Sequence, residues 1–203
     1  MSQLLELLER QASPVRRTLR AGEVLFHRGD PGDAAQVIRS GLVGLEIGAP
    51  GREPLLALIA RAGDVVAAER VLRPGTCHSA TGRALTDCEV QLLREPDLDL
   101  DPLGAEIRAE FAQHLAAQTA QLMDRLVEIA HQSATAKVAG ALCRLAGDTR
   151  IICTSQDVVA AAAGIVRVTA NAELRHLAER RVISLLRRRI SILDRAALEA
   201  IAS

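Results

Sequence analysis

Short apolar stretches alternate with polar turns over the first half of the chain. These stretches span residues 23–27, 36–38, 42–47, 55–59, 64–67 and 90–93. Ten of the 14 glycines fall between Gly22 and Gly82, and many short strands separated by such turns are typical of an antiparallel sandwich or barrel. Four glycines stand at tight-turn positions that favour a positive φ: Gly29, Gly32, Gly63 and Gly75. The pattern therefore predicts an antiparallel β domain.

The pattern changes after an acidic, proline-bounded segment at residues 96–102. From Leu103 to about Gln132 it becomes helical and contains neither Gly nor Pro after Gly104. A heptad repeat runs through Leu115, Leu122 and Ile129 and, three residues before each of them, Ala112, Thr119 and Leu126. An a/d seam of about three heptads predicts a helix that pairs with a second copy of the chain. A helix that packs on its own β domain is the alternative.

The last third of the chain contains shorter elements. They are predicted as helices at residues 134–146, 155–163 and about 166–180, and as strands at 151–153, 182–185 and 190–193. Thr154 or Ser155 can cap the second of these helices, and Gly164 stands at the turn that follows it. Residues 187–189, all arginine, form the turn between the last two strands. Two helices joined at a glycine and followed by a hairpin predict a winged helix-turn-helix.

Charge separates the two ends of the chain, although the net charge is zero. Residues 1–132 carry 14 basic and 19 acidic side chains, a net charge of −5, whereas residues 133–203 carry 11 and 6, a net charge of +5. A basic C-terminal module indicates a polyanionic partner such as DNA. No apolar run reaches the roughly 20 residues that cross a bilayer, and the N-terminus lacks the features of a secretory signal. We therefore expect a cytoplasmic protein with no membrane partner.

Composition excludes several kinds of site. Trp and Tyr are absent, and Phe26 and Phe111 are the only aromatic residues, which argues against base-stacking platforms and aromatic cages. The four cysteines contain no C-x-x-C pair, so we expect buried free thiols and no metal site: Cys77, Cys88, Cys143 and Cys153. No catalytic triad, paired carboxylates or Gly-rich phosphate loop is visible, and we expect no enzyme activity.

Several local motifs occur in a familiar order. They are the segments 21–26, 28–33 and 40–41, Gly63-Asp64-Val65-Val66, Thr135-Ala136-Lys137-Val138-Ala139, 154–158, 163–169, 182–183 and 189–194. Together they resemble the Crp/Fnr family of bacterial transcription regulators over about residues 15–203. The resemblance implies an α+β fold with a cyclic-nucleotide-binding-like β-roll (jelly roll), a long dimerisation helix and a C-terminal winged helix-turn-helix. These parts are expected at residues 1–102, 103–132 and 133–203.

The second helix of a helix-turn-helix enters the major groove, and its N-terminal half reaches base edges. Val166 and Ala170 lie in that half beside Arg167, which can grip guanine, and Asn171, which can pair with adenine. Phosphate contacts are expected from the start of the supporting helix and from the wing. The predicted DNA-binding residues are Thr154, Ser155, Gln156, Arg167, Thr169, Asn171, Arg175, Arg187, Arg188 and Arg189.

The resemblance also identifies an effector pocket, where this chain departs from the family. A cyclic nucleotide is held in the family by a Glu on the ribose and an Arg-Ser pair on the phosphate. The matching residues here are Ala68, with Glu69 beside it, and His78-Ser79. Leu122 and Met123 stand where the dimer helix would meet the adenine. We therefore expect no cofactor and no response to cAMP. The alternative is a haem bound by Cys77 or His78. A His78 that is simply a surface residue of its loop would not bind haem.

These observations favour a homodimeric, sequence-specific regulator that binds double-stranded DNA at a pseudo-palindromic operator, without control by cAMP and without a required ligand. RNA polymerase is a candidate partner. The competing hypothesis is a ligand- or haem-sensing module whose winged helix binds another protein instead of DNA.

Overall fold

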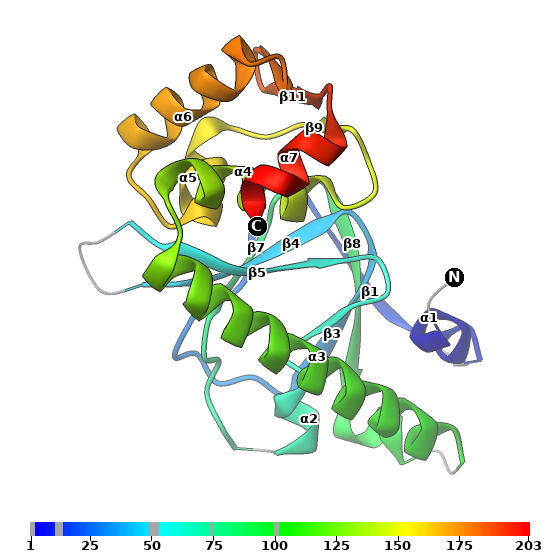
Figure 1. Ribbon diagram of the computed structural model, residues 1–203. Coiled ribbons are helices and arrows are strands. Elements are labelled where there is room, and N and C mark those ends of the chain that lie inside the picture. The colour runs from blue at the N-terminus through cyan, green and yellow to red at the C-terminus, as the bar shows by residue number, and fades with distance from the viewer. Residues whose placement is uncertain (1–2, 11–13, 49–52, 74, 100–101) are drawn as a thin grey trace. The chain divides into compact units, whose positions relative to one another are not determined.

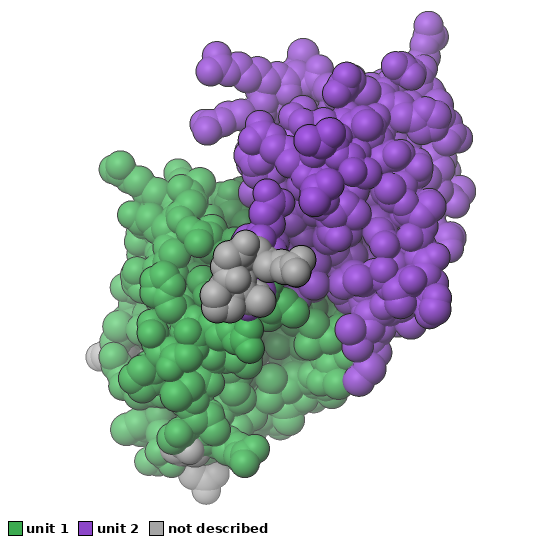
Figure 2. Space-filling model, turned by 90° about the vertical axis from the view of Figure 1, so that its left-hand side faces the viewer, with its two compact units in different colours: residues 1–47, 58–122 green, residues 48–57, 123–203 purple. Residues whose placement is uncertain are grey.

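The computed structural model describes residues 3–10, 14–48, 53–73, 75–99 and 102–203. The chain forms two compact units, one of residues 1–47 with 58–122 and one of residues 48–57 with 123–203 (Figure 2). The long helix α3 (Leu103–His131) contributes to both (Figure 1). Its limits agree with the helix predicted from Leu103 to about Gln132. Part of the predicted acidic linker, residues 100 and 101, lies outside the described residues.

Two four-stranded sheets form the β domain, as the alternating pattern predicts. The first has the order β1 (Val15–Leu19), β8 (Cys88–Arg94), β3 (Ala34–Ser40), β6 (Val65–Val66). The second has the order β2 (Val24–Phe26), β7 (Thr81–Ala84), β4 (Leu42–Ile47), β5 (Leu55–Arg61). The pairings of β8 with β1 and β3, and of β7 with β2 and β4, are antiparallel.

Strand β3 shows how the β domain builds its core. Successive side chains of a strand point to opposite faces, and Val37 and Ile38, both fully buried, accordingly belong to two different apolar clusters. The Val37 cluster also contains Ile107 and Phe111 from the start of α3, with Leu115 packed against it. The first turns of α3 therefore pack on the β domain of the same chain, which was the alternative to a pairing helix.

Several elements escaped the sequence pattern. They are α1 (Gln3–Leu8), β1, the short helix α2 (Glu69–Leu72), η1 (Glu95–Leu98), β7 and α7 (Arg195–Ala202). Strand β1 lies at a sheet edge with four of its five residues exposed, so it lacks the apolar alternation that marks a strand. The prediction for Gly32 was wrong, because only Gly29, Gly63 and Gly75 of the four have a positive φ. Gly32 instead permits close packing, since a Cβ there would lie 2.4 Å from His78 Nε2.

The second unit has the predicted winged helix-turn-helix. Its elements are α4 (Ala134–Ala146), β9 (Ile151–Ile152), α5 (Gln156–Ala163), α6 (Arg167–Glu179), β10 (Ile183–Leu186), β11 (Arg189–Ile192) and α7. Strand β11 pairs with both β10 and β9, which gives a three-stranded wing sheet. Ser133, Ser155 and Asp194 cap α4, α5 and α7 through their side-chain oxygens.

Candidate nucleic-acid interface and effector cassette

A sharp turn joins α5 to α6. Gly164 ends α5 in the left-handed conformation, with φ 68° and ψ 34°, which favours glycine because it has no Cβ. Helix α6 then buries Ala170, Leu174 and Leu177 completely. These three residues anchor α6, and they leave the opposite side of the helix facing solvent.

The exposed side of α6 differs in part from the side that sequence reasoning chose. Val168 is 80% exposed, and Ala172, Arg175 and His176 are exposed with it. Ala170 was wrongly placed among the base-reading positions, because it is fully buried. His176 was missed, although the apolar spacing of residues 170, 174 and 177 already marks it as part of the outer side of the helix.

The predicted readers on α6 lie in different environments. Arg167 is exposed and forms an ion pair with Asp157 of α5, with 2.9 Å between Arg167 Nη1 and Asp157 Oδ1. Thr169 and Asn171 are half-buried, and Asn171 Oδ1 is buried without a hydrogen-bond partner. Arg175 is exposed, and its Nε donates to the Asn171 carbonyl at 3.3 Å. Arg167 and Arg175 are therefore the accessible cationic side chains of α6.

A hollow of about 290 Å³ brings most of the predicted DNA-binding residues together. It is lined by Thr154, Ser155, Gln156, Asp157, Arg167 and the wing residues 185–190. The three wing arginines, Arg187, Arg188 and Arg189, are exposed, and Arg188 takes a positive φ of 55° at the tip. Hydroxyl and amide groups of a helix start and a set of guanidinium groups thus face one concave surface, which suits a phosphate backbone.

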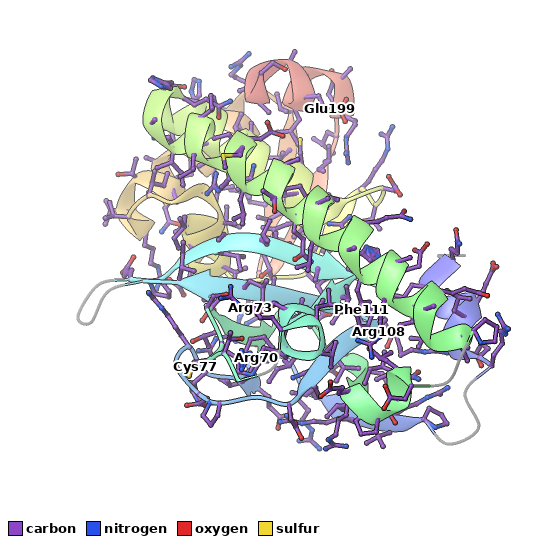
Figure 3. All side chains as sticks on the ribbon, turned by 90° about the horizontal axis from the view of Figure 1, so that it is seen from below. Arg70, Arg73, Cys77, Arg108, Phe111 and Glu199 are labelled. Atoms are coloured by element: carbon purple, nitrogen blue, oxygen red, sulfur yellow. The ribbon has the colours of Figure 1, made fainter. Side chains whose placement is uncertain are left out.

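The effector cassette is the segment from Gly63 to Ala80, and its side chains are largely enclosed. Ala68 is 1% exposed at the start of α2, whereas Glu69 is half-buried in the first turn. Arg70, which sequence reasoning missed, is only 2% exposed. Its guanidinium donates to Thr76 Oγ1 and, at 3.2 Å, to the Gly32 carbonyl, while its Nε is buried without a partner. Figure 3 labels Arg70 of α2 and Cys77, which belongs to the loop that follows this helix.

His78 is a buried residue, so the alternative of a surface loop histidine was wrong. It is 6% exposed, and its ring stacks on Phe26 with 4.0 Å between centroids. Burial lowers the pKa of His78, the Arg70 cation lowers it further, and Glu69 and Asp30 oppose the shift. Its Nδ1 is buried without a partner. Ser79 is exposed. An enclosed imidazole therefore occupies the position that the resemblance matches to a phosphate-binding arginine.

The remaining predicted residues lie outside this enclosure. Leu122 and Met123 of α3 are exposed, Met123 by 60%. The prediction of buried thiols was wrong for Cys77 and Cys153, which are exposed, and held for Cys88, whose pKa is raised by burial. Cys143 is half-buried. Among the described residues, no group of three or more His, Cys, Asp or Glu side chains is placed to hold a metal ion.

Comparison with protein families assigns both halves of the chain. Residues 16–99 match the cyclic nucleotide-binding domain family, and residues 136–201 match the Crp-like helix-turn-helix domain family. Comparison with curated protein sequences gives no match. No helix within the described part of the chain is long and apolar enough to cross a membrane.

Solved structures share this fold over most of the chain. A CRP/FNR-family transcriptional regulator from Thermus thermophilus is 28% identical, with a TM-score of 0.80 over 93% of this chain and 98% of its own. A CRP-family regulator from the same organism is 23% identical, with a TM-score of 0.79 over 92% and 96% of the two chains. FixK2 from Bradyrhizobium japonicum is 16% identical, with a TM-score of 0.79 over 94% and 98%.

The two matched domains, in this order on either side of a long helix, define a transcription regulator with a DNA-binding helix-turn-helix. The chain belongs to the Crp/Fnr family.

Proposed function

We propose that the protein acts as a homodimer that binds a pseudo-palindromic operator without cAMP. The observation that carries the proposal is the hollow at which the start of α5, Arg167 and the three wing arginines meet. Phosphate contacts from this surface supply affinity, and Arg167 at the start of α6 supplies base discrimination. A regulator held at a promoter in this way acts through RNA polymerase.

A stripe of exposed residues on α3 supports the homodimer. The stripe consists of Ala112, Ala116, Thr119, Met123, Leu126 and Ala130, all exposed and spaced alternately by four and three residues. It keeps Ala112, Thr119 and Leu126 of the predicted seam but not Leu115, which packs on the β domain. Leu126 is 61% and the neighbouring Val127 62% exposed, which is unfavourable for apolar side chains on an isolated helix. Small and apolar residues at this spacing suit a second α3 helix. Two symmetric recognition helices then contact half-sites about one helical turn apart.

The enclosed cassette supports independence from cyclic nucleotides. Ala68 has no carboxylate for a ribose hydroxyl, and His78, buried and neutral, replaces the phosphate-binding arginine. The cavity between α3 and strands β4 and β5, which Gln118 and His114 line, has a volume of about 40 Å³. Ligand pockets commonly have about 300–1,000 Å³. His78 Nε2 lies close to Gly32, where a Cβ would be only 2.4 Å from it, and this crowding does not favour an iron on that nitrogen.

Selection from a random pool of duplex DNA by the purified protein, with and without added cAMP, tests the proposal. We expect the same palindrome to be enriched in both arms. Enrichment only with cAMP would overturn independence from the nucleotide. Failure to enrich any sequence at low salt would favour a winged helix that binds protein instead of DNA.

A further inference from the structure

Two arginines from different helices meet at the end of α5. Arg125 of α3 and Arg144 of α4 both donate a hydrogen bond to the carbonyl of Ala162, Arg144 at 3.0 Å. Both also pair with Glu128, and Arg144 Nη1 lies 2.7 Å from each of its carboxylate oxygens. The side chain of Arg125 is only 3% exposed. All of these residues belong to the second unit.

The end of α5 explains why the arginines converge there. The last carbonyls of a helix have no partner within the helix. The N–H of Gly164 donates to the carbonyls of Ala160 and Ala161, and the two guanidinium groups donate hydrogen bonds to the carbonyl of Ala162. The negative end of the helix dipole and Glu128 together balance the two cations. Burial, followed by the Arg125 cation, lowers the pKa of Arg144, and Glu128 opposes this shift.

Two glycines make room for the guanidinium groups. A Cβ on Gly140, in the interior of α4, would lie 3.3 Å from Arg144 Nη1. A Cβ on Gly164 would lie 3.4 Å from Arg125 Nη2 and 3.0 Å from Leu55 Cδ1. Glycine in a helix interior is unfavourable, so its presence in α4 is consistent with a demand for this space.

The junction between α3 and α4 is held by further polar contacts. Lys137, the only lysine of the chain, donates from Nζ to the carbonyl of Ile129 at 2.9 Å. Gln132 Nε2 donates to the carbonyl of Ala202 in α7 at 2.9 Å. Hydrogen bonds thus join the last turns of α3 to α4, α5 and α7, and the end of α3 belongs to the same compact unit as the helix-turn-helix.

We propose that Arg125, Glu128 and Arg144 are positioning residues that hold the recognition helix at one orientation to the end of α3, and thereby set the half-site spacing of the operator. The proposal rests on the homodimer proposed above, in which paired α3 helices carry the two helix-turn-helix units. Ala162 lies two residues before the Gly164 turn, so a tether on its carbonyl acts directly on the start of α6.

Operators with altered spacing test this role. The variants are Arg125→Met and Arg144→Met, and Arg108→Met is the matched control, since Arg108 lies on the same helix with a half-exposed guanidinium 3.5 Å from Asp99. We expect the wild type and the control to lose about tenfold in affinity when one or two base pairs are inserted between the half-sites. The Arg125→Met and Arg144→Met proteins should lose less than about threefold in affinity on the same insertions. A purely structural role would weaken binding to every spacing equally, and that result would overturn the proposal.

Amide hydrogen exchange of the wild type and both variants, without DNA, gives an independent measurement. We expect the amides of residues 163–168 to exchange about tenfold faster in the variants while the buried amides of α4 are unchanged. Equal exchange at residues 163–168 would overturn the proposal. Arg144→Met is the milder variant, because the Arg144 side chain is 28% exposed, and it decides the question if Arg125→Met does not fold. If the wild type selects no palindrome, the proposed function fails, and exchange alone then decides whether the cluster holds the turn.

Discussion

Arginines occur both in the effector cassette and in the wing, but the two regions use them in opposite ways. Arg70 of the cassette is 2% exposed and bonded to Thr76 and Gly32 of the same chain. Arg187, Arg188 and Arg189 of the wing are exposed beside a hollow. A guanidinium binds an external anion only where it is accessible and not already paired within the protein. Burial, rather than residue type, therefore decides which region can bind a polyanion.

The largest effect on operator binding is expected from a charge placed in the α3 stripe. An operator with two half-sites needs two copies of the DNA-binding region, and the stripe is proposed to join them. Leu126→Glu places a carboxylate on each helix of the proposed pair, where like charges repel and apolar contact is lost. We expect a monomer by sedimentation, with operator affinity reduced by at least about 100-fold. Leu126→Met is the matched control and should remain dimeric. A dimeric Leu126→Glu variant would place the interface elsewhere.

The wing arginines give the next effect. Replacing Arg187, Arg188 and Arg189 by Ala removes up to three phosphate contacts from each protomer of the proposed dimer, so the slope of log affinity against log salt should fall by up to about five. The loss should be similar on operator and random duplex, because phosphate contacts carry no base information. Arg150→Ala removes an exposed arginine of the same unit that does not line the hollow, and it serves as the control. An unchanged slope would contradict a phosphate-binding wing.

A smaller, sequence-specific effect is expected at Arg167. Arg167→Met should cost about 1–3 kcal/mol of discrimination at one base pair per half-site and leave the other positions unchanged. In the free protein Arg167 pairs with Asp157, and exposed pairs of this kind contribute little to stability. Asp157→Asn should therefore leave folding unchanged and strengthen operator binding a few-fold. Selection with the Arg167→Met protein measures the first effect, and a uniform loss over all positions would exclude base reading by this residue.

The architecture followed from sequence wherever apolar spacing was regular. The limits of α3, α4, α5 and the wing hairpin were predicted to within one or two residues, because buried residues recur there at helical or strand spacing. Strand β1 and helix α2 were missed, since their exposed or very short segments lack such a period.

The environments of single side chains were harder to predict than the elements. The position of His78 was found by resemblance, but its burial depends on Phe26, which is 52 residues away in the sequence. Arg70 gave no signal, because an arginine in a short polar segment is ordinarily exposed, and helix α2 is too short to show an apolar period. Tertiary contacts of this kind decide which residues of the cassette face a ligand, and a local pattern does not contain them.

The smallest effect tests the other side of the comparison, the enclosure of the cassette. Because the pKa of His78 is lowered in the folded protein, the unfolded chain binds its proton more readily. The free energy of unfolding should therefore fall as the pH drops below about 6.5, the ordinary pKa of histidine, toward the lower pKa of the folded protein. His78→Gln removes this contribution, so its stability, measured by urea unfolding, should fall less on acidification than that of the wild type. His176→Gln, at an exposed position on α6, is the control and should follow the wild type. Parallel curves for His78→Gln and the wild type would mean that His78 is as accessible to protons as a surface residue, and the cassette would then be open to ligands after all.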